Sequence, residues 1–191
     1  MKVLDRKLNG VVLFEPKVFA DDRGYFSETF RQDVFEEAIG HKVNFIQDNE
    51  SKSSFGVLRG LHYQLPPFSQ SKLVRVIEGS VIDVAVDIRK GSPTFGQYVA
   101  IELSSDNKHQ LFVPRGFAHG FLVTSPTVTF AYKVDNYYAP EYDRGIIYND
   151  ASIGIEWGLD LDKLLLSEKD KKQPLLQEAD LFDFKDDQYK Q

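Results

Sequence analysis

Residues 57–64 form the first stretch whose side chains suggest chemistry. The run Val-Leu-Arg-Gly-Leu-His-Tyr-Gln favours a β-strand, yet it places Arg59, His62 and Gln64 within six residues, and Lys72 follows soon after. A strand that served only stability would need none of these polar groups. A histidine surrounded by cations can act as a general base on an anionic substrate. We therefore predict that His62 is a base at the mouth of a β-structure.

The local sequence offers one carboxylate as a partner for His62. Residues 81–88 alternate, with four aliphatic side chains on one face and Asp83, Ala85 and Asp87 on the other. This polar face is predicted to line a cavity or to meet solvent. On a neighbouring strand, Asp83 could bond the Nδ1–H group of His62 and leave Nε2 free as the base.

Three further residues each have a structural and a functional interpretation. His119 lies between glycines that allow either close approach of a ligand or simply a turn and a bulge. Tyr132 shares a face with apolar neighbours, so its phenol belongs to the core or to a pocket. Asp170 fits a helix capping box that begins at Ser167, and the local pattern favours that role.

A metal site is not predicted. Metal-binding double-stranded β-helices often use a His-x-His pair plus a glutamate, but here Gln64 stands at the second position after His62. His119 would add one ligand, and no third nitrogen or sulfur ligand is evident. We expect catalysis without a metal.

Composition excludes several classes of function. The chain has 191 residues, a net charge of -6 and a pI near 5.2, which gives no general attraction to nucleic acid. It has no cysteine, no apolar run near the ~18 residues that a membrane span needs, and no signal-peptide core at its start. These features predict a cytoplasmic protein that binds neither nucleic acid nor a membrane.

The periodicity predicts an all-β fold in a single domain covering residues 1–191. About ten short strands recur at roughly ten-residue spacing, as in a sandwich or barrel. One amphipathic helix is expected over Gln32–Ile39, ending at Gly40, and the tail from Ser167 is expected to be partly helical. The predicted strands include Lys72–Ile77, Val81–Ile88, Tyr98–Leu103, Gln110–Val113, Phe117–Val123, Val128–Lys133, Ile146–Tyr148 and Ile153–Trp157.

Many segments, in order along nearly the whole chain, carry a resemblance to one family. They include Phe19–Gly24, Gln47–Ser53, Val57–Gln64, Lys72–Arg75, Asp83–Arg89, Ser92–Gly96, Pro114–Gly120, Asn136–Tyr138, Ile153–Trp157 and Ser167–Asp170. The chain resembles the dTDP-4-dehydrorhamnose 3,5-epimerase family. The resemblance implies a cupin-type jelly roll, a double-stranded β-helix with a few short peripheral helices. It also implies a cofactor-free homodimer with strand exchange between subunits.

The resemblance also implies a reaction and its residues. The enzymes of this family convert dTDP-4-dehydro-6-deoxy-D-glucose to dTDP-4-dehydro-L-rhamnose in dTDP-L-rhamnose biosynthesis, by removing protons next to the 4-keto group. His62 matches the base and Asp170 its partner, in preference to Asp83. Lys72 matches the group that stabilises the enolate, and Tyr132 the acid on the opposite face.

Substrate-binding positions carry over in the same way. The matching residues are Arg23, Glu28, Gln47, Asp48, Asn49, Arg59, Lys72, His119, Asp143 and Lys169, together with Tyr138, which matches the ring that stacks on thymine. Two alternatives remain open. A relative could invert only one of the two carbons, and a non-catalytic cupin could bind the nucleotide sugar without reacting, although the latter would be expected to lose His62 and Tyr132.

Overall fold

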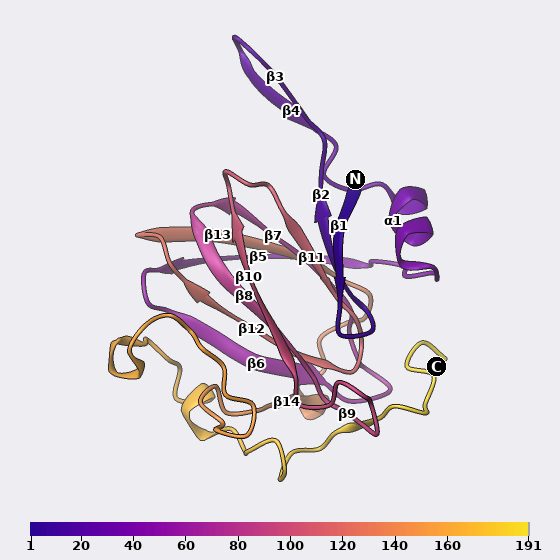
Figure 1. Ribbon diagram of the computed structural model, residues 1–191, viewed down its shortest axis with the longest axis vertical. Coiled ribbons are helices and arrows are strands. Elements are labelled where there is room, and N and C mark those ends of the chain that lie inside the picture. Colours follow the sequence, from indigo (N-terminus) through magenta and orange to yellow (C-terminus); the bar gives the residue numbers. More distant parts are fainter. Residues whose placement is uncertain (191) are drawn as a thin grey trace.

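Two antiparallel sheets face each other in the computed structural model, which describes residues 1–190 (Figure 1). The first sheet has the order β1 (Lys2–Lys7), β2 (Val11–Glu15), β11 (Gln110–Val113), β7 (Lys72–Glu78), β13 (Thr127–Val134) and β5 (Gln47–Ser54). The second has the order β10 (Tyr98–Ser104), β8 (Ser80–Asp87), β12 (Phe117–Val123), β6 (Leu58–Gln64) and β14 (Asp143–Gly145). This arrangement is the predicted cupin-type jelly roll.

Short elements surround the two sheets. Strand β9 (Arg89–Lys90) pairs in parallel with β15 (Phe182–Asp183), and β3 (Val18–Asp21) forms a hairpin with β4 (Gly24–Ser27). The helices are α1 (Gln32–Ile39) and the 3₁₀ turns η1 (Pro140–Tyr142), η2 (Leu161–Lys163) and η3 (Asp170–Lys172). Within residues 1–190, no helix is long and apolar enough to cross a membrane.

Apolar side chains form three layers, one between the sheets and one on each outer face. The inner layer includes Val74, Leu111 and Phe130, all buried. Helix α1 covers the outer face of the first sheet through Phe35, whose ring is fully buried against Phe112. A helix of eight residues is marginal by itself, so the burial of Phe35, worth about 2–3 kcal/mol, holds α1 in place.

The C-terminal segment covers the outer face of the second sheet (Figure 1). Ile146, Ile153 and Trp157 pack there against residues of β6, β8 and β12. The predicted strands Ile146–Tyr148 and Ile153–Trp157 are wrong. Ile146 exchanges two backbone hydrogen bonds with Leu61 on β6, but no strand continues from it. Ile153 and Trp157 are buried by lying on the sheet rather than by pairing in it. The predicted helical tail from Ser167 is present only as one 3₁₀ turn, η3.

The helix prediction is confirmed. Helix α1 spans Gln32–Ile39 and ends at Gly40, whose φ of 83° is left-handed and whose N–H bonds to the carbonyl of Glu36.

One face of β8 differs from the expectation. The face that carries Asp83 and Asp87 meets no solvent, since both carboxylates are fully buried.

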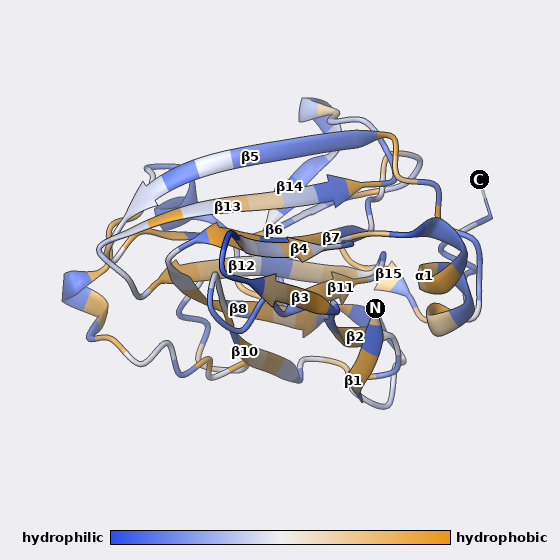
Figure 2. Cartoon of the chain, turned by 90° about the horizontal axis from the view of Figure 1, so that it is seen from above, coloured by the Kyte–Doolittle hydropathy of each residue, from blue (hydrophilic) through white to orange (hydrophobic). Residues whose placement is uncertain are grey.

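Strands β1 and β5 were not predicted. Figure 2 shows that β5 is hydrophilic along its length, in contrast to β8. Polar residues on both faces of a strand give no hydrophobic alternation, so periodicity alone does not reveal it.

Candidate active site

A cavity of about 620 Å³ opens between the two sheets. The polar side chains that line it come from strands of both sheets and from the C-terminal segment. Those predicted for the site are Arg59 and His62 on β6, Lys72 on β7, His119 on β12, Tyr132 on β13, and Lys169 and Asp170 at η3. The structure thus brings together seven of the residues predicted for the site.

A bulge in β6 turns Arg59 and His62 toward the same cavity. These residues are three positions apart, so in a regular strand they would point to opposite faces. In the structure, His62 pairs with His119 and Arg59 pairs with Phe121, which gives three steps along β6 for two along β12. The extra residue in β6 restores the common face.

Glycine at position 60 makes this bulge possible. Gly60 has a φ of 135°, which other residues rarely adopt, and a Cβ atom added there would lie 2.5 Å from the Cα of Gly120. The two glycines therefore allow β6 and β12 to approach closely beside the cavity.

His62 and Asp170 form a close pair at the cavity wall. The Nε2 atom of His62 lies 2.5 Å from Oδ1 of Asp170, whose side chain is almost fully buried. The capping prediction also describes a real contact, because the backbone N–H of Asp170 donates to the hydroxyl of Ser167. Asp170 contacts Nε2, so Nδ1 is the free nitrogen, the reverse of the arrangement expected for an Asp83 partner.

The environment of Asp170 favours its charged form. Burial acts to raise the pKa of this carboxyl, but the hydrogen bonds from His62 and Ser167 and the charges of His62 and Lys169 outweigh that effect. The pKa of Asp170 lies below its usual range, so the group is a carboxylate near neutral pH.

Asp83 is the partner of His119 and not of His62, which corrects the expectation from the local sequence. Both carboxylate oxygens of Asp83 lie 3.0 Å from Nε2 of His119, and both side chains are buried. The cause is the strand order, because β8 neighbours β12 and does not touch β6. Burial lowers the pKa of His119, although the Asp83 carboxylate opposes that shift.

Lys72 lies close to His62 with its ammonium group buried. Its Nζ atom is 3.5 Å from the carbonyl oxygen of His62. Burial lowers the pKa of Lys72 to about 8, and the carboxylates of Asp83 and Asp143 act against that shift. Near neutral pH the group is a charged donor that gains from an additional anionic partner.

Tyr132 reaches the cavity from the other sheet. It lies on β13, whereas His62 lies on β6, so the phenol and the imidazole belong to opposite walls. Burial raises the pKa of Tyr132, and the nearby Arg59 only partly offsets this. The phenol therefore carries its proton at neutral pH and can donate it.

Three of the predicted binding residues form a chain at the rim. The Tyr138 hydroxyl donates to Asp143 over 3.0 Å, and the ammonium of Lys169 pairs with the same carboxylate. The Tyr138 ring is exposed, which leaves it available for stacking. Gln64 shapes this rim, because its amide bonds to backbone atoms of Tyr137 and Ala139.

The other predicted binding residues lie on β5 or on the hairpin. On β5, Gln47 and Asn49 are joined by a 2.8 Å hydrogen bond, and Asn49 lies directly opposite Tyr132. The side chain of Asp48 points to the other face, where it pairs with Lys133, so the structure does not bring it to the cavity. Arg23 and Glu28 do not line the cavity either, because Arg23 lies in the hairpin turn and Glu28 just after β4.

Sequence reasoning missed two kinds of residue. Ser53 on β5 holds the guanidinium of Arg59 through two contacts of 3.1 Å. A serine in an unrecognised polar strand gives no signal of this role. Leu164, Leu165 and Leu166 also line the cavity, and their apolar side chains carry no chemical signature.

In the described part of the chain, no three His, Asp or Glu side chains gather as a metal-binding group.

The comparisons with known proteins show the family of the chain. The family profile described as dTDP-4-dehydrorhamnose 3,5-epimerase matches residues 5–178. The chain belongs to the dTDP-4-dehydrorhamnose 3,5-epimerase family. It is 55% identical over 182 residues to the dTDP-4-dehydrorhamnose 3,5-epimerase of Shigella flexneri, which covers 95% of this chain and 99% of that protein.

Solved structures of this family have the same fold. The dTDP-6-deoxy-D-glucose-3,5-epimerase of Legionella pneumophila, in complex with dTDP-4-keto-L-rhamnose, has a TM-score of 0.92 at 45% identity. That match covers 97% of this chain and 99% of the other. The dTDP-4-dehydrorhamnose 3,5-epimerase of Elizabethkingia anophelis has a TM-score of 0.89 at 48% identity, with 93% and 97% covered.

Proposed function

We infer that the protein is a 3,5-epimerase of dTDP-4-dehydro-6-deoxy-D-glucose and forms dTDP-4-dehydro-L-rhamnose. One observation carries the proposal: a His62–Asp170 pair and the Tyr132 phenol face one cavity from opposite sheets, with Lys72 beside the histidine. Inversion of a carbon needs a base on one face and an acid on the other. Relatives named as 3,5-epimerases, among them one at 55% identity, support the same activity.

The proposed mechanism assigns one step to each group. The 4-keto group acidifies the C–H bonds at C3 and C5, and Nδ1 of His62 removes each proton in turn. The Asp170 carboxylate stabilises the imidazolium that results, as acidic partners of catalytic histidines do. Lys72 donates to the enolate oxygen, and Tyr132 returns a proton from the opposite face. Before the second carbon reacts, the imidazolium releases its proton to solvent and the Tyr132 phenolate takes one up.

The binding roles follow from charge and position. Arg59 lies in the cavity wall and offers a planar fork of N–H donors for a diphosphate. We propose that Tyr138 stacks on the thymine ring, while Asp143 and Lys169 hold the adjacent rim of the site. His119 donates from Nε2 to Asp83 and, in its neutral form, would accept a hydrogen bond from a sugar hydroxyl through Nδ1. The absence of cysteine fits a reducing compartment, and we place the enzyme in the cytoplasm.

A D₂O experiment tests the function. The purified protein is incubated with dTDP-4-dehydro-6-deoxy-D-glucose in D₂O, and deuterium is followed by NMR. Deuterium at both C3 and C5 with inversion supports the proposal, whereas inversion at one carbon alone indicates a mono-epimerase. A folded sample that binds the nucleotide sugar without any exchange would refute the enzymatic function.

Tyr132→Phe should reduce inversion more than exchange. The variant keeps the base and the enolate stabiliser but lacks the proton donor on the opposite face. We expect inversion at both carbons to fall by about 10²-fold or more, with deuterium exchange at least partly retained. The ratio of exchanged to inverted product, measured by NMR, checks this. An equal loss of both rates would contradict the acid role of Tyr132.

We also propose that the enzyme is a homodimer in which the β3–β4 hairpin reaches the partner subunit. The hairpin projects from the body (Figure 1), and it exposes Phe19, Tyr25 and Phe26. Exposed aromatic side chains on one element are typical of an interaction surface. Arg23 lies in the turn of this hairpin with 89% of its side chain exposed, so it is placed to complete a neighbouring site.

A mixing experiment tests the dimer and the origin of Arg23. Arg23→Ala and His62→Ala each inactivate a site, so neither variant should be active alone. If Arg23 acts in the partner's site, each mixed dimer holds one intact site. Random exchange of subunits should then restore roughly a quarter of the wild-type activity. Absence of rescue, with mixed dimers detected by native mass spectrometry, would show that Arg23 does not act across the interface.

A further inference from the structure

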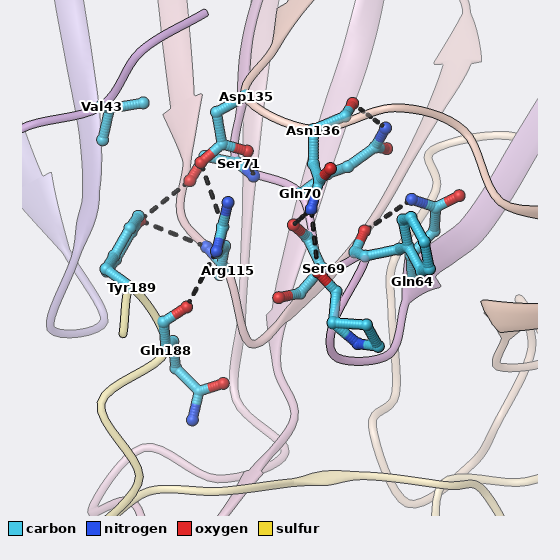
Figure 3. Close-up of polar contacts among 12 residues, drawn as sticks. Val43, Gln64, Ser69, Gln70, Ser71, Arg115, Asp135, Asn136, Gln188 and Tyr189 are labelled. Atoms are coloured by element: carbon cyan, nitrogen blue, oxygen red, sulfur yellow. Dashed lines mark hydrogen bonds and ion pairs between the residues drawn. The ribbon is translucent and has the colours of Figure 1, made fainter. Parts of the chain in front are cut away.

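A buried polar network lies at the end of the first sheet, directly behind Lys72. Figure 3 shows its central members, Ser71, Arg115 and Asp135, which follow or precede three adjacent strands. One oxygen of Asp135 accepts from the backbone N–H of Ser71 over 2.6 Å, and the other accepts from Nε of Arg115 over 3.0 Å. Ser71 is fully buried, and the Arg115 and Asp135 side chains are 8% and 4% exposed.

The C-terminal tail completes this network. The hydroxyl of Tyr189 shares a 2.9 Å hydrogen bond with that of Ser71, and the Arg115 backbone N–H lies 3.4 Å from the Tyr189 oxygen (Figure 3). The Arg115 guanidinium donates to the carbonyl of Gln188 and lies over the Tyr189 ring. His41, just after α1, packs on the same ring at 4.5 Å.

The network holds the residue that precedes Lys72. Ser71 is bonded through both its backbone N–H and its hydroxyl. One residue later, Lys72 pairs with Val113 on β11 and with Val134 on β13. Arg115 and Asp135 lie just beyond those two pairing partners. The network therefore ties the ends of β11, β7 and β13 together at the level of Lys72.

We propose that Tyr189 is a positioning residue for Lys72. Through Ser71, and with the Arg115–Asp135 ion pair, it fixes the start of β7 and so sets where the Lys72 ammonium meets the enolate oxygen. This inference rests on the proposed epimerase function. A displacement of about 1 Å at a catalytic group can cost roughly 10²-fold in rate, so a tether one residue away has a large influence.

The pKa of Lys72 depends on how deeply its ammonium group is buried, so a change in its position can be measured as a change in that pKa. A looser Lys72 would be less desolvated, and its pKa would move up from about 8 toward the ordinary lysine value. The titratable and charged groups that face Lys72 are His62 on β6, Asp83 on β8, His119 on β12 and Asp143 on β14. None of these belongs to the network, so a change in the network leaves their chemistry intact.

Tyr189→Phe is the test, because it keeps the ring on Arg115 and His41 and removes only the hydroxyl. We expect kcat to fall about tenfold with KM changed less than about twofold. The alkaline limb of the pH–rate profile should move to higher pH. Ser71→Ala removes the other half of the hydrogen bond and should give the same shift. The double variant should be no worse than either single one, as expected for residues that act through one bond.

Tyr98→Phe is the matched control. Its hydroxyl also bonds to the C-terminal segment, at the backbone N–H of Glu156, but far from Ser71 in the sequence and on the other sheet. It should leave kcat and the alkaline limb unchanged. If Tyr189→Phe and Ser71→Ala behave like Tyr98→Phe, the proposal is overturned.

A measurement independent of turnover separates this inference from the proposed function. The rate of acetylation of Lys72 by acetic anhydride is followed against pH by peptide mass spectrometry. Its midpoint should rise in Tyr189→Phe and stay in place in Tyr98→Phe. A wild-type protein without epimerase activity would refute the function, while an unchanged midpoint in Tyr189→Phe would refute the positioning role.

Discussion

Replacing His62 by alanine should abolish deuterium exchange at both C3 and C5. His62 supplies the proposed base, and its loss should lower both exchange rates by about 10³-fold or more. The two carbons should be affected alike, because the same base serves both. Asp170 stabilises the His62 imidazolium whichever carbon has lost its proton, and a single cavity holds the substrate. NMR in D₂O measures both positions in one experiment.

The matched control for this variant is His109→Ala. His109 lies between β10 and β11 and does not line the cavity, so its removal should leave both rates near those of the wild type. Exchange that persists at one carbon in His62→Ala would reveal a second base. Circular dichroism and binding of dTDP would show that the variant is folded with an intact site.

Lys72→Met should lower kcat by about 10²- to 10³-fold. A single donor to a developing oxyanion typically contributes about 3–4 kcal/mol, and Lys72 is the buried cation next to the base. The effect should fall mainly on kcat, because the charge on the enolate oxygen develops only during the reaction. Lys171→Met is the control, since Lys171 also lines the cavity but pairs with Glu168 at the surface.

The lowered pKa of Lys72 predicts how activity depends on pH. With a pKa of about 8, the Lys72 ammonium loses its proton as the pH rises through that value, so kcat/KM should decline above it. Lys72→Arg should be slower, because the guanidinium is larger, but its charge persists to high pH. The decline near pH 8 should therefore disappear in Lys72→Arg, and its persistence would assign the limb to another group.

Much of the fold was accessible from periodicity, because hydrophobic alternation marks strands that are buried on at least one face. Strands β7, β8 and β12 and helix α1 were predicted for this reason. The polar strand β5 and the apolar coverings at Ile153 and Trp157 were not, because burial there depends on what the rest of the chain places against them. Local sequence does not contain that information.

The site was predictable in type but not in pairing. His62 was identified from its neighbours, and the family resemblance pointed to Asp170. Local sequence alone favoured Asp83, because it cannot give the order of strands that puts β12 between β8 and β6. The resemblance likewise placed Asp48 in the site, but the alternation along β5 turns its side chain to the outer face.

The bulge at Gly60 interrupts the alternation of inward-facing and outward-facing side chains along β6. Upstream of it, odd-numbered Arg59 points into the cavity, and downstream of it, even-numbered His62 does so. Straightening the bulge into regular pairing, with every residue kept, would make the side chains alternate without interruption along β6. Either the base would then turn toward the outer layer occupied by Trp157, or the arginine would. A designer who grafts this site onto another sheet must copy the irregularity as well as the side chains.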